Sequence, residues 1–250
     1  MHLALHARGG AEGMIKALLF DVFGTLVDWR TGVAREAREI LAPLGVQADW
    51  LAFADAWRDQ YQPSMEEVRA GRLPFGKLDV LHRRNLDVVL RDFGLDRVDE
   101  AARAHLNLAW HRLDAWPDVA PGLEHLRRKF LLAPCSNGHI SLMANLAPRN
   151  RFPWDAILGA EIARDYKPKP AVYLASAAAF DCAPEEAMMV AAHSYDLASA
   201  AACGLRTAFV ARPGERGPGT GESRPQGPVD VAVGSLVELA QALSGEAKSP

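Results

Sequence analysis

The chain has 250 residues, of which 49% are hydrophobic and 24% are charged, and its formal net charge at pH 7 is −3. This length and composition are typical of a globular protein with a sizeable core. The charge offers no basic surface for nucleic acid, and no apolar run approaches the ~20 residues that span a bilayer. We therefore expect neither nucleic acid nor a membrane among its partners.

The first residues of the chain and its cysteines both favour a cytoplasmic location. Residues 1–13 hold three glycines and lack the apolar core of a signal peptide, so we expect a flexible tail. Cys135, Cys182 and Cys203 show neither paired spacing nor a metal-ligand pattern. Free thiols in a reducing cytoplasm are the simplest interpretation.

The run LLFDVF at 18–23 predicts a buried strand that delivers Asp21 just before a glycine turn. A block without a convincing strand follows, because its apolar residues recur at helical spacing. Its expected helices lie at 30–45, 48–61, 77–93 and 99–114.

Beyond this block, short apolar runs alternate with helical patterns. The expected strands lie within 130–137, 155–160, 187–193, 206–211 and 229–235. The expected helices lie near 121–129, 139–148, 170–180, 195–203 and 235–243. Such alternation predicts βαβ units and a mostly parallel sheet, to which the first strand also belongs. The Pro/Gly-rich segment 212–228 is predicted to be a surface loop without core-forming content.

The predicted fold is therefore α/β, a doubly wound parallel sheet with an inserted all-helical cap domain. The core domain is expected to comprise residues 14–29 and 115–250, and the cap residues 30–114. Ligands of such sheets bind outside the carboxyl ends of the strands. Several runs end there in polar residues, namely Asp21, Ser136, Asn137, His193 and, just beyond, Asp196.

Most candidate site residues also have a purely structural interpretation. Asp21 suits a turn, but an acid that ends a buried strand costs desolvation, which favours function. Ser136 and Asn137 can cap a helix, and Lys167 in YKPKP can be solvated. Arg58 can extend to solvent over cap aromatics, and Tyr173, Thr25, His193 and Asp196 each have packing or capping alternatives.

The ordered motifs FDVFGTL, SNG, YKPKPAVY and HSYDLASAA together resemble the haloacid dehalogenase superfamily, and within it most closely the L-2-haloacid dehalogenases. The resemblance covers the chain from Met14 to about Leu243. Phosphatases of this superfamily carry a second Asp two residues after the nucleophile, where this chain has Phe23. They also carry a magnesium-binding acid where this chain has Ala192. A departing halide needs no proton, so the resemblance implies dehalogenation without metal or cofactor.

The resemblance implies that Asp21 displaces halide from C2 of a short 2-haloalkanoic acid, and that water then hydrolyses the aspartyl ester to a 2-hydroxy acid. The implied catalytic residues are Asp21, Thr25, Lys167, Asp196 and His193. The implied substrate-binding residues are Val22, Phe23, Arg58, Ser136, Asn137 and Tyr173. Lys167 and Thr25 would keep Asp21 ionised, Ser136 and backbone amides would bind the carboxylate, and Arg58 with Asn137 would hold the halide.

One departure concerns the water-activating group. His193 stands where the family pattern has an asparagine, so either Asp196 or His193 is expected to activate water. Two other functions stay open: a magnesium-dependent phosphatase acting on a small phosphoester, and an idle member that binds a ligand through its cap. The expected partners are a 2-haloacid and halide ion, and the aromatic-rich cap suggests a homodimer.

Overall fold

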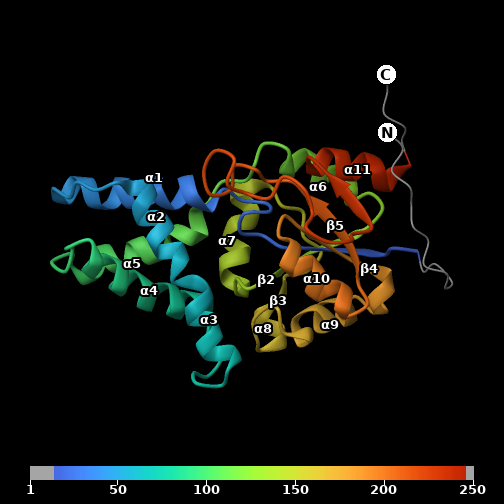
Figure 1. Ribbon diagram of the computed structural model, residues 1–250, viewed down its shortest axis with the longest axis horizontal. Helices are drawn as coiled ribbons and strands as arrows, with labels where there is room; N and C mark the ends of the chain where they lie inside the picture. The colour runs from blue at the N-terminus through green and yellow to red at the C-terminus, as the bar shows by residue number, and fades with distance from the viewer. Residues whose placement is uncertain (1–13, 246–250) are drawn as a thin grey trace.

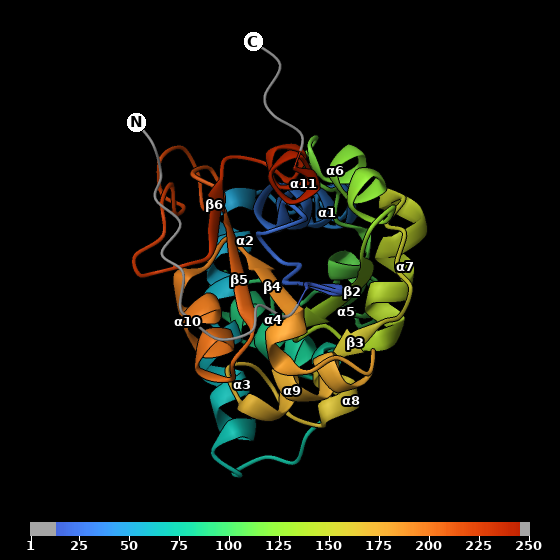
Figure 2. The same cartoon turned by 90° about the vertical axis from the view of Figure 1, so that its right-hand side faces the viewer.

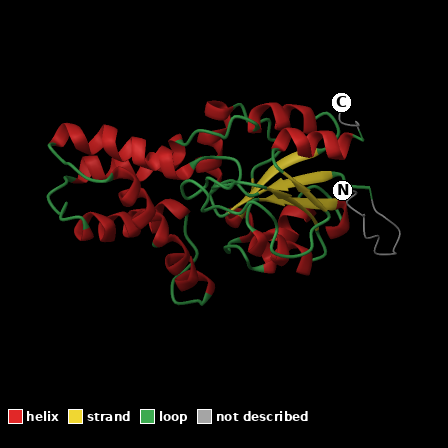
Figure 3. Ribbon diagram, turned by 45° about the horizontal axis from the view of Figure 1, so that its top comes forward, coloured by secondary structure: helices red, strands yellow, loops and turns green. Residues whose placement is uncertain are grey.

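The structure, a computed structural model, describes residues 14–245, and its sheet has six strands with parallel pairing throughout (Figures 1 and 3). The strand order is β3-β2-β1-β4-β5-β6. The strands are β1 (Ala17–Phe20), β2 (Leu131–Ser136), β3 (Leu158–Gly159), β4 (Ala187–Ala191), β5 (Arg206–Val210) and β6 (Val231–Val233). Five of them fall within a predicted strand, and β1 begins one residue before its predicted run, so the doubly wound parallel sheet is confirmed.

Helices cover both faces of the sheet because its strands are apolar on both sides. In β1, Leu18 and Phe20 enter the core on one face, whereas Leu19 enters the core on the other. Figure 2 shows α6 and α11 above the sheet and α9 and α10 below it. These flanking elements are α6 (Val119–Leu126), α7 (Ile140–Asn150), α8 (Ala160–Ala163), α9 (Pro170–Ala178), η3 (Pro184–Glu186), α10 (Ser194–Ala202) and α11 (Leu236–Ser244).

All regular elements between β1 and α6 are helical, as predicted for the cap, and Figure 1 shows most of them beside the sheet. They are α1 (Trp29–Leu41), η1 (Ala42–Leu44), α2 (Trp50–Asp59), α3 (Tyr61–Arg69), α4 (Leu78–Asp92), α5 (Glu100–Asn107) and η2 (Leu108–Arg112). One direct link to the sheet domain comes from Arg69 at the end of α3. Its Nη1 donates to the carbonyl of Lys167 at 2.9 Å. The domain limits at 30 and 114 stay predictions.

Two α-helices were not expected from the sequence. In α3 the buried residues Tyr61, Met65 and Val68 recur at helical spacing, but Pro63 in the first turn and the polar remainder obscure the pattern. The other, α8, is only four residues long and is too short for periodicity to reveal.

The prediction for 212–228 is wrong in part, because two of its charged residues are buried. Arg212 and Glu215 are only 8% and 5% exposed. Both guanidinium Nη atoms of Arg212 donate to the Asp118 carboxylate at 2.9 Å, and its Nε donates to the carbonyl of Thr25 at 2.9 Å. A charged side chain can be buried when an opposite charge and hydrogen bonds pair with it. The composition of the segment does not reveal such pairing, so it predicts a solvent-exposed loop.

Two expectations depend on how much of the chain the structure describes. The tail predicted at residues 1–13 lies outside the described residues. Within residues 14–245, no helix combines the length and apolar character that crossing a membrane requires.

Candidate active site

Asp21 follows β1 directly, and its backbone N–H continues the sheet by donating to the carbonyl of Val190 at 3.0 Å. Gly24 then turns the chain with a φ of +87°, a left-handed conformation that side chains disfavour. A Cβ at Gly24 would also lie 2.2 Å from Oε1 of Glu215. The glycine therefore serves both the turn and the close approach of the Glu215 carboxylate.

Three side chains hold the Asp21 carboxylate. Lys167 donates from Nζ to Oδ1 at 2.9 Å, and Thr25 donates from Oγ1 to Oδ2 at 2.7 Å. Nδ1 of His193 lies 3.1 Å from the same Oδ2. Thr25 is itself fixed, because its Oγ1 accepts the backbone N–H of Ala192 at 2.9 Å. Both oxygens of Asp21 are thus oriented by residues from separate segments.

Lys167 joins Asp21 to a second buried carboxylate. Its Nζ lies 2.5 Å from Oδ2 of Asp196, whose Oδ1 accepts the hydroxyl of Tyr173 at 2.5 Å. Tyr173, grouped with the substrate-binding residues in the sequence analysis, therefore contacts Asp196 instead of reaching the Asp21 carboxylate. Its role in this geometry is to orient the acid that faces Lys167.

These charges change one another's protonation. Burial opposes ionisation of Asp21, but Lys167 and His193 outweigh burial and hold the pKa of Asp21 well below its usual range. Burial also disfavours a charged Lys167, yet Asp196 and Asp21 raise its pKa above the ordinary value. Burial raises the pKa of Asp196, against the opposing attraction of Lys167. The result is an ionised Asp21 beside a protonated Lys167.

Glu215 is the site residue that the sequence analysis missed. Its Oε2 lies 2.9 Å from Nε2 of His193, and its Oε1 accepts the indole N–H of Trp29 at 3.0 Å. Burial lowers the pKa of His193, but hydrogen bonds to Asp21 and Glu215 outweigh it and raise that pKa to about 10. At neutral pH, His193 is therefore a cation between two carboxylates.

Ser136 ends β2 and Asn137 follows it, as predicted, and both are buried. Oδ1 of Asn137 accepts the backbone N–H of Lys167 at 2.8 Å, which positions that lysine's main chain. Oγ of Ser136 accepts the N–H of Gly138 at 3.0 Å. Since a Cβ at Gly138 would lie 3.4 Å from both Ser136 Oγ and the Phe23 ring, these two side chains flank the same glycine.

Arg58 comes from α2 and reaches the sheet domain across aromatic rings. Its Cζ lies 4.1 Å from the ring centroid of Tyr61, 5.3 Å from that of Trp29 and 5.9 Å from that of Phe23. Arg58 is 8% exposed, and its Nη1 is buried without a hydrogen-bond partner among the described residues. This nitrogen is therefore a donor suited to an anion. Val22 is fully buried, and its carbonyl accepts the N–H groups of Leu26 and Val27 in the turn after Asp21.

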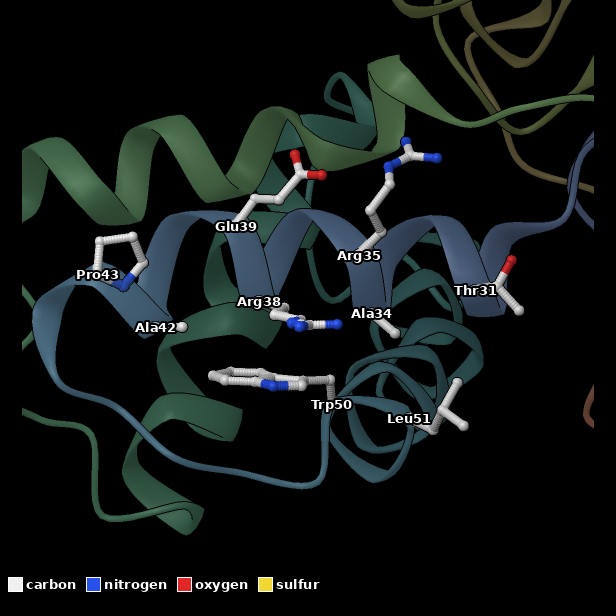
Figure 4. Close-up of a pocket in the computed structure, with 9 residues that line it drawn as sticks. All are labelled: Thr31, Ala34, Arg35, Arg38, Glu39, Ala42, Pro43, Trp50 and Leu51. Atoms are coloured by element: carbon white, nitrogen blue, oxygen red, sulfur yellow. The ribbon is translucent and has the colours of Figure 1, made fainter.

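A cavity of about 290 Å³ adjoins these groups and is lined by Arg58, Tyr61, His193 and Glu215, among others. A larger hollow of about 640 Å³ lies on the cap between α1 and α2. Figure 4 shows the Arg38 side chain over the indole of Trp50 in that hollow. The smaller cavity is the one beside the ionised carboxylate, and we take it as the candidate active site.

The donor set around Asp21 suits nucleophilic attack by the carboxylate better than magnesium chemistry. A hard divalent cation needs several oxygen ligands. Phe23 and Ala192 provide no side-chain oxygen at the two positions named in the sequence analysis. Both Asp21 oxygens already contact protonated or hydroxyl donors, which compete with a cation for the same lone pairs.

The comparisons with known proteins agree with the motifs. Residues 15–204 match the haloacid dehalogenase-like hydrolases. A curated relative, (S)-2-haloacid dehalogenase 1 of Pseudomonas sp. (strain CBS-3), is 30% identical over 79% of this chain and 85% of its own length.

Two solved structures are similar over nearly all of this chain. A defluorinating L-2-haloacid dehalogenase, Rha0230, superimposes with a TM-score of 0.90 and 43% identity, covering 92% of this chain and 95% of its own. The L-2-haloacid dehalogenase PA0810 has a TM-score of 0.88 and 41% identity, covering 92% and 99%. The resemblance stated from the sequence motifs is confirmed.

Proposed function

This chain belongs to the haloacid dehalogenase-like hydrolases, and we propose that it hydrolyses short 2-haloalkanoic acids, haloacetate and L-2-halopropionate, to 2-hydroxy acids. The observation that carries the proposal is the buried ion pair between Asp21 and Lys167, with Phe23 at the position of the phosphatase acid. An ionised carboxylate held by a lysine is a nucleophile ready for displacement at carbon.

In the first step, an Asp21 oxygen attacks C2 of the substrate from the side opposite the halogen. A C2–O bond forms as the carbon–halogen bond breaks, the halide leaves with the bonding electrons, and C2 is inverted. The carboxylate of the substrate would be held by Ser136 and by backbone amides that follow Asp21. Arg58 and Asn137 would stabilise the departing halide through preorganised donors.

In the second step, water attacks the ester carbonyl of Asp21, and the 2-hydroxy acid departs as the carboxylate is restored. We propose His193 as the group that receives the proton of this water, because it lines the cavity and contacts Asp21. Esterification removes the negative charge of Asp21, which in the free enzyme helps to keep His193 protonated. His193 then releases that proton to solvent, and its neutral imidazole takes a proton from the attacking water and passes it to the C2 oxygen that leaves. Asp196, which contacts Lys167 and Tyr173, would orient the lysine.

The test is halide release from chloroacetate and from each enantiomer of 2-chloropropionate, in buffer with a chelator. We expect turnover of chloroacetate and the L form, and loss of that turnover in Asp21→Asn. Halide release that is equal in Asp21→Asn and the parent enzyme would exclude the aspartyl ester. Magnesium-dependent phosphate release without any halide release would instead assign a phosphatase.

The cellular location and the oligomeric state of the protein stay predictions. A cytoplasmic location agrees with the free thiols Cys135, Cys182 and Cys203. A homodimer is predicted from the aromatic-rich cap, and light scattering on the purified chain measures its mass directly.

A further inference from the structure

Three metal-binding side chains from separate segments meet where the inserted helices adjoin the sheet domain. Asp79 lies in the first turn of α4, His111 lies in η2, and His139 is the N-cap of α7. One ligand atom from each lies within 4.8 Å of the other two. Among the described residues, none of the three hydrogen-bonds to Asp21, Lys167 or their direct partners.

The carboxylate of Asp79 stands between the two imidazoles. Nε2 of His111 lies 3.0 and 3.1 Å from the two Asp79 oxygens, and Nε2 of His139 lies 3.3 Å from Oδ2. A tetrahedral zinc ion with bonds of about 2.0–2.1 Å separates its ligand atoms by roughly 3.4 Å. The nitrogen–oxygen separations are therefore close to those of a coordinated metal, and small side-chain shifts would admit one.

His139 supplies an independent observation. Its side chain is 2% exposed, and neither ring nitrogen meets hydrogen-bond geometry within the described part of the chain, where Nε2 has the 3.3 Å ion-pair contact with Asp79 and Nδ1 has no polar partner. Polar groups this deeply buried are normally paired, since an unpaired one loses its hydration without compensation. A metal bound through Nε2 would satisfy the nitrogen that already faces Asp79.

The second ring nitrogen of His111, Nδ1, can support coordination as well. This nitrogen lies 2.8 Å from Nδ2 of Asn145 on α7. A half-turn of the Asn145 amide would place its oxygen there, so that Nδ1 donates and the lone pair of Nε2 points to a metal. Ligating histidines commonly have such a partner on the second nitrogen, which orients the ring.

We propose that Asp79, His111 and His139 form a site for a divalent transition metal of the zinc class, with solvent at the remaining position. Imidazole nitrogens favour zinc, cobalt and nickel over magnesium or calcium. The Asp79 side chain is 25% exposed, which gives the site access to solvent. A metal here ties α4 of the inserted helices to α7 beside the sheet. No metal was expected from the sequence, because Phe23 and Ala192 stand where the magnesium-binding family members have acids. Ligands from three distant segments form no spacing motif that would reveal this separate site.

The first experiment measures binding by isothermal titration of the metal-free full-length chain with zinc sulfate. We expect one ion per chain, and at least tenfold weaker binding in Asp79→Asn and in His111→Gln. Both variants retain an amide that can hydrogen-bond, which protects the fold. His105→Gln is the matched control, because His105 is exposed at the end of α5 and should leave binding unchanged.

The second experiment separates this site from incidental histidine binding. Cobalt in a tetrahedral site with two nitrogen ligands and oxygen ligands gives visible ligand-field bands, and we expect these bands in the parent chain. This measurement needs no variant, so it tests the site even if a variant fails to fold. Zinc should raise the melting temperature of the parent chain and of His105→Gln, but not that of Asp79→Asn or His111→Gln. Absence of zinc binding in the parent chain, or unchanged stoichiometry and affinity in both variants, would overturn the proposal.

Discussion

Nε2 of His193 lies 2.9 Å from Oε2 of Glu215, so a loop residue far along the chain completes the surroundings of Asp21. The other Glu215 oxygen is held by the indole N–H of Trp29 at 3.0 Å. Glu215 therefore cannot move away from the imidazole without breaking a second buried hydrogen bond. We infer that this carboxylate fixes both the orientation and the protonation of His193.

Replacing Glu215 by glutamine tests this relationship. The amide keeps the shape but removes the charge, so the pKa of His193 should fall. In the ester intermediate a weaker base takes the proton of the water less readily, so halide release at neutral pH should drop roughly tenfold. In the pH profile of halide release, the limb that depends on His193 should move to lower pH. Glu185→Gln is the control, because Glu185 is exposed in η3 and does not line the cavity. An unchanged rate and an unchanged pH profile in Glu215→Gln would show that Glu215 does not act through His193.

The contrast between Asp21 and Glu215 shows what a single sequence can predict here. Asp21 ends an apolar run, so its place at the sheet edge follows from local pattern. The six strands and most helices follow in the same way. Glu215 lies in a Pro/Gly-rich segment with no period, and its burial depends on distant partners, Trp29 and His193. Gly24 leaves room for the Glu215 carboxylate because it has no side chain, but a glycine in a turn does not by itself indicate which distant residue approaches it.

Replacing Lys167 by methionine should destabilise the fold as well as abolish halide release. The change leaves Asp21 and Asp196 buried without their shared cation, which costs about 3–5 kcal/mol at neutral pH. Protonation of the carboxylates relieves that cost, so the deficit should shrink as the pH falls. Urea unfolding at neutral and acidic pH measures this, with Lys169→Met as the control. A deficit that does not change with pH would mean that lost packing, not lost charge, causes it.

The raised pKa of His193 predicts a fall in stability on the alkaline side. The folded protein holds this proton up to a pKa of about 10, whereas the unfolded chain releases it near 6.5. Between these values the folded state binds more protons, so the free energy of unfolding decreases as pH rises. The contribution is complete below 6.5 and lost above 10. His193→Gln should flatten this slope in urea unfolding across the same range, and an equally steep slope in the variant would contradict the assignment.

Arg58 should act through its guanidinium and not through charge alone. Its Nη1 is buried without a hydrogen-bond partner among the described residues, and its Cζ lies 4.1 Å from the centre of the Tyr61 ring. Lysine keeps the charge but loses the planar group that stacks on aromatic rings and presents several donors at once.

We therefore expect Arg58→Lys to lower kcat/KM for chloroacetate by about a hundredfold, the usual loss for one donor to a developing anion. The loss should appear mainly in kcat if Arg58 stabilises the departing halide, and mainly in KM if it binds the substrate carboxylate. Arg38→Gln is the control, because Arg38 is an exposed arginine in the separate hollow of the cap. Comparable kinetics for Arg58→Lys and the parent enzyme would remove Arg58 from the site, and Tyr61 and His193 would then be the cavity donors left to test.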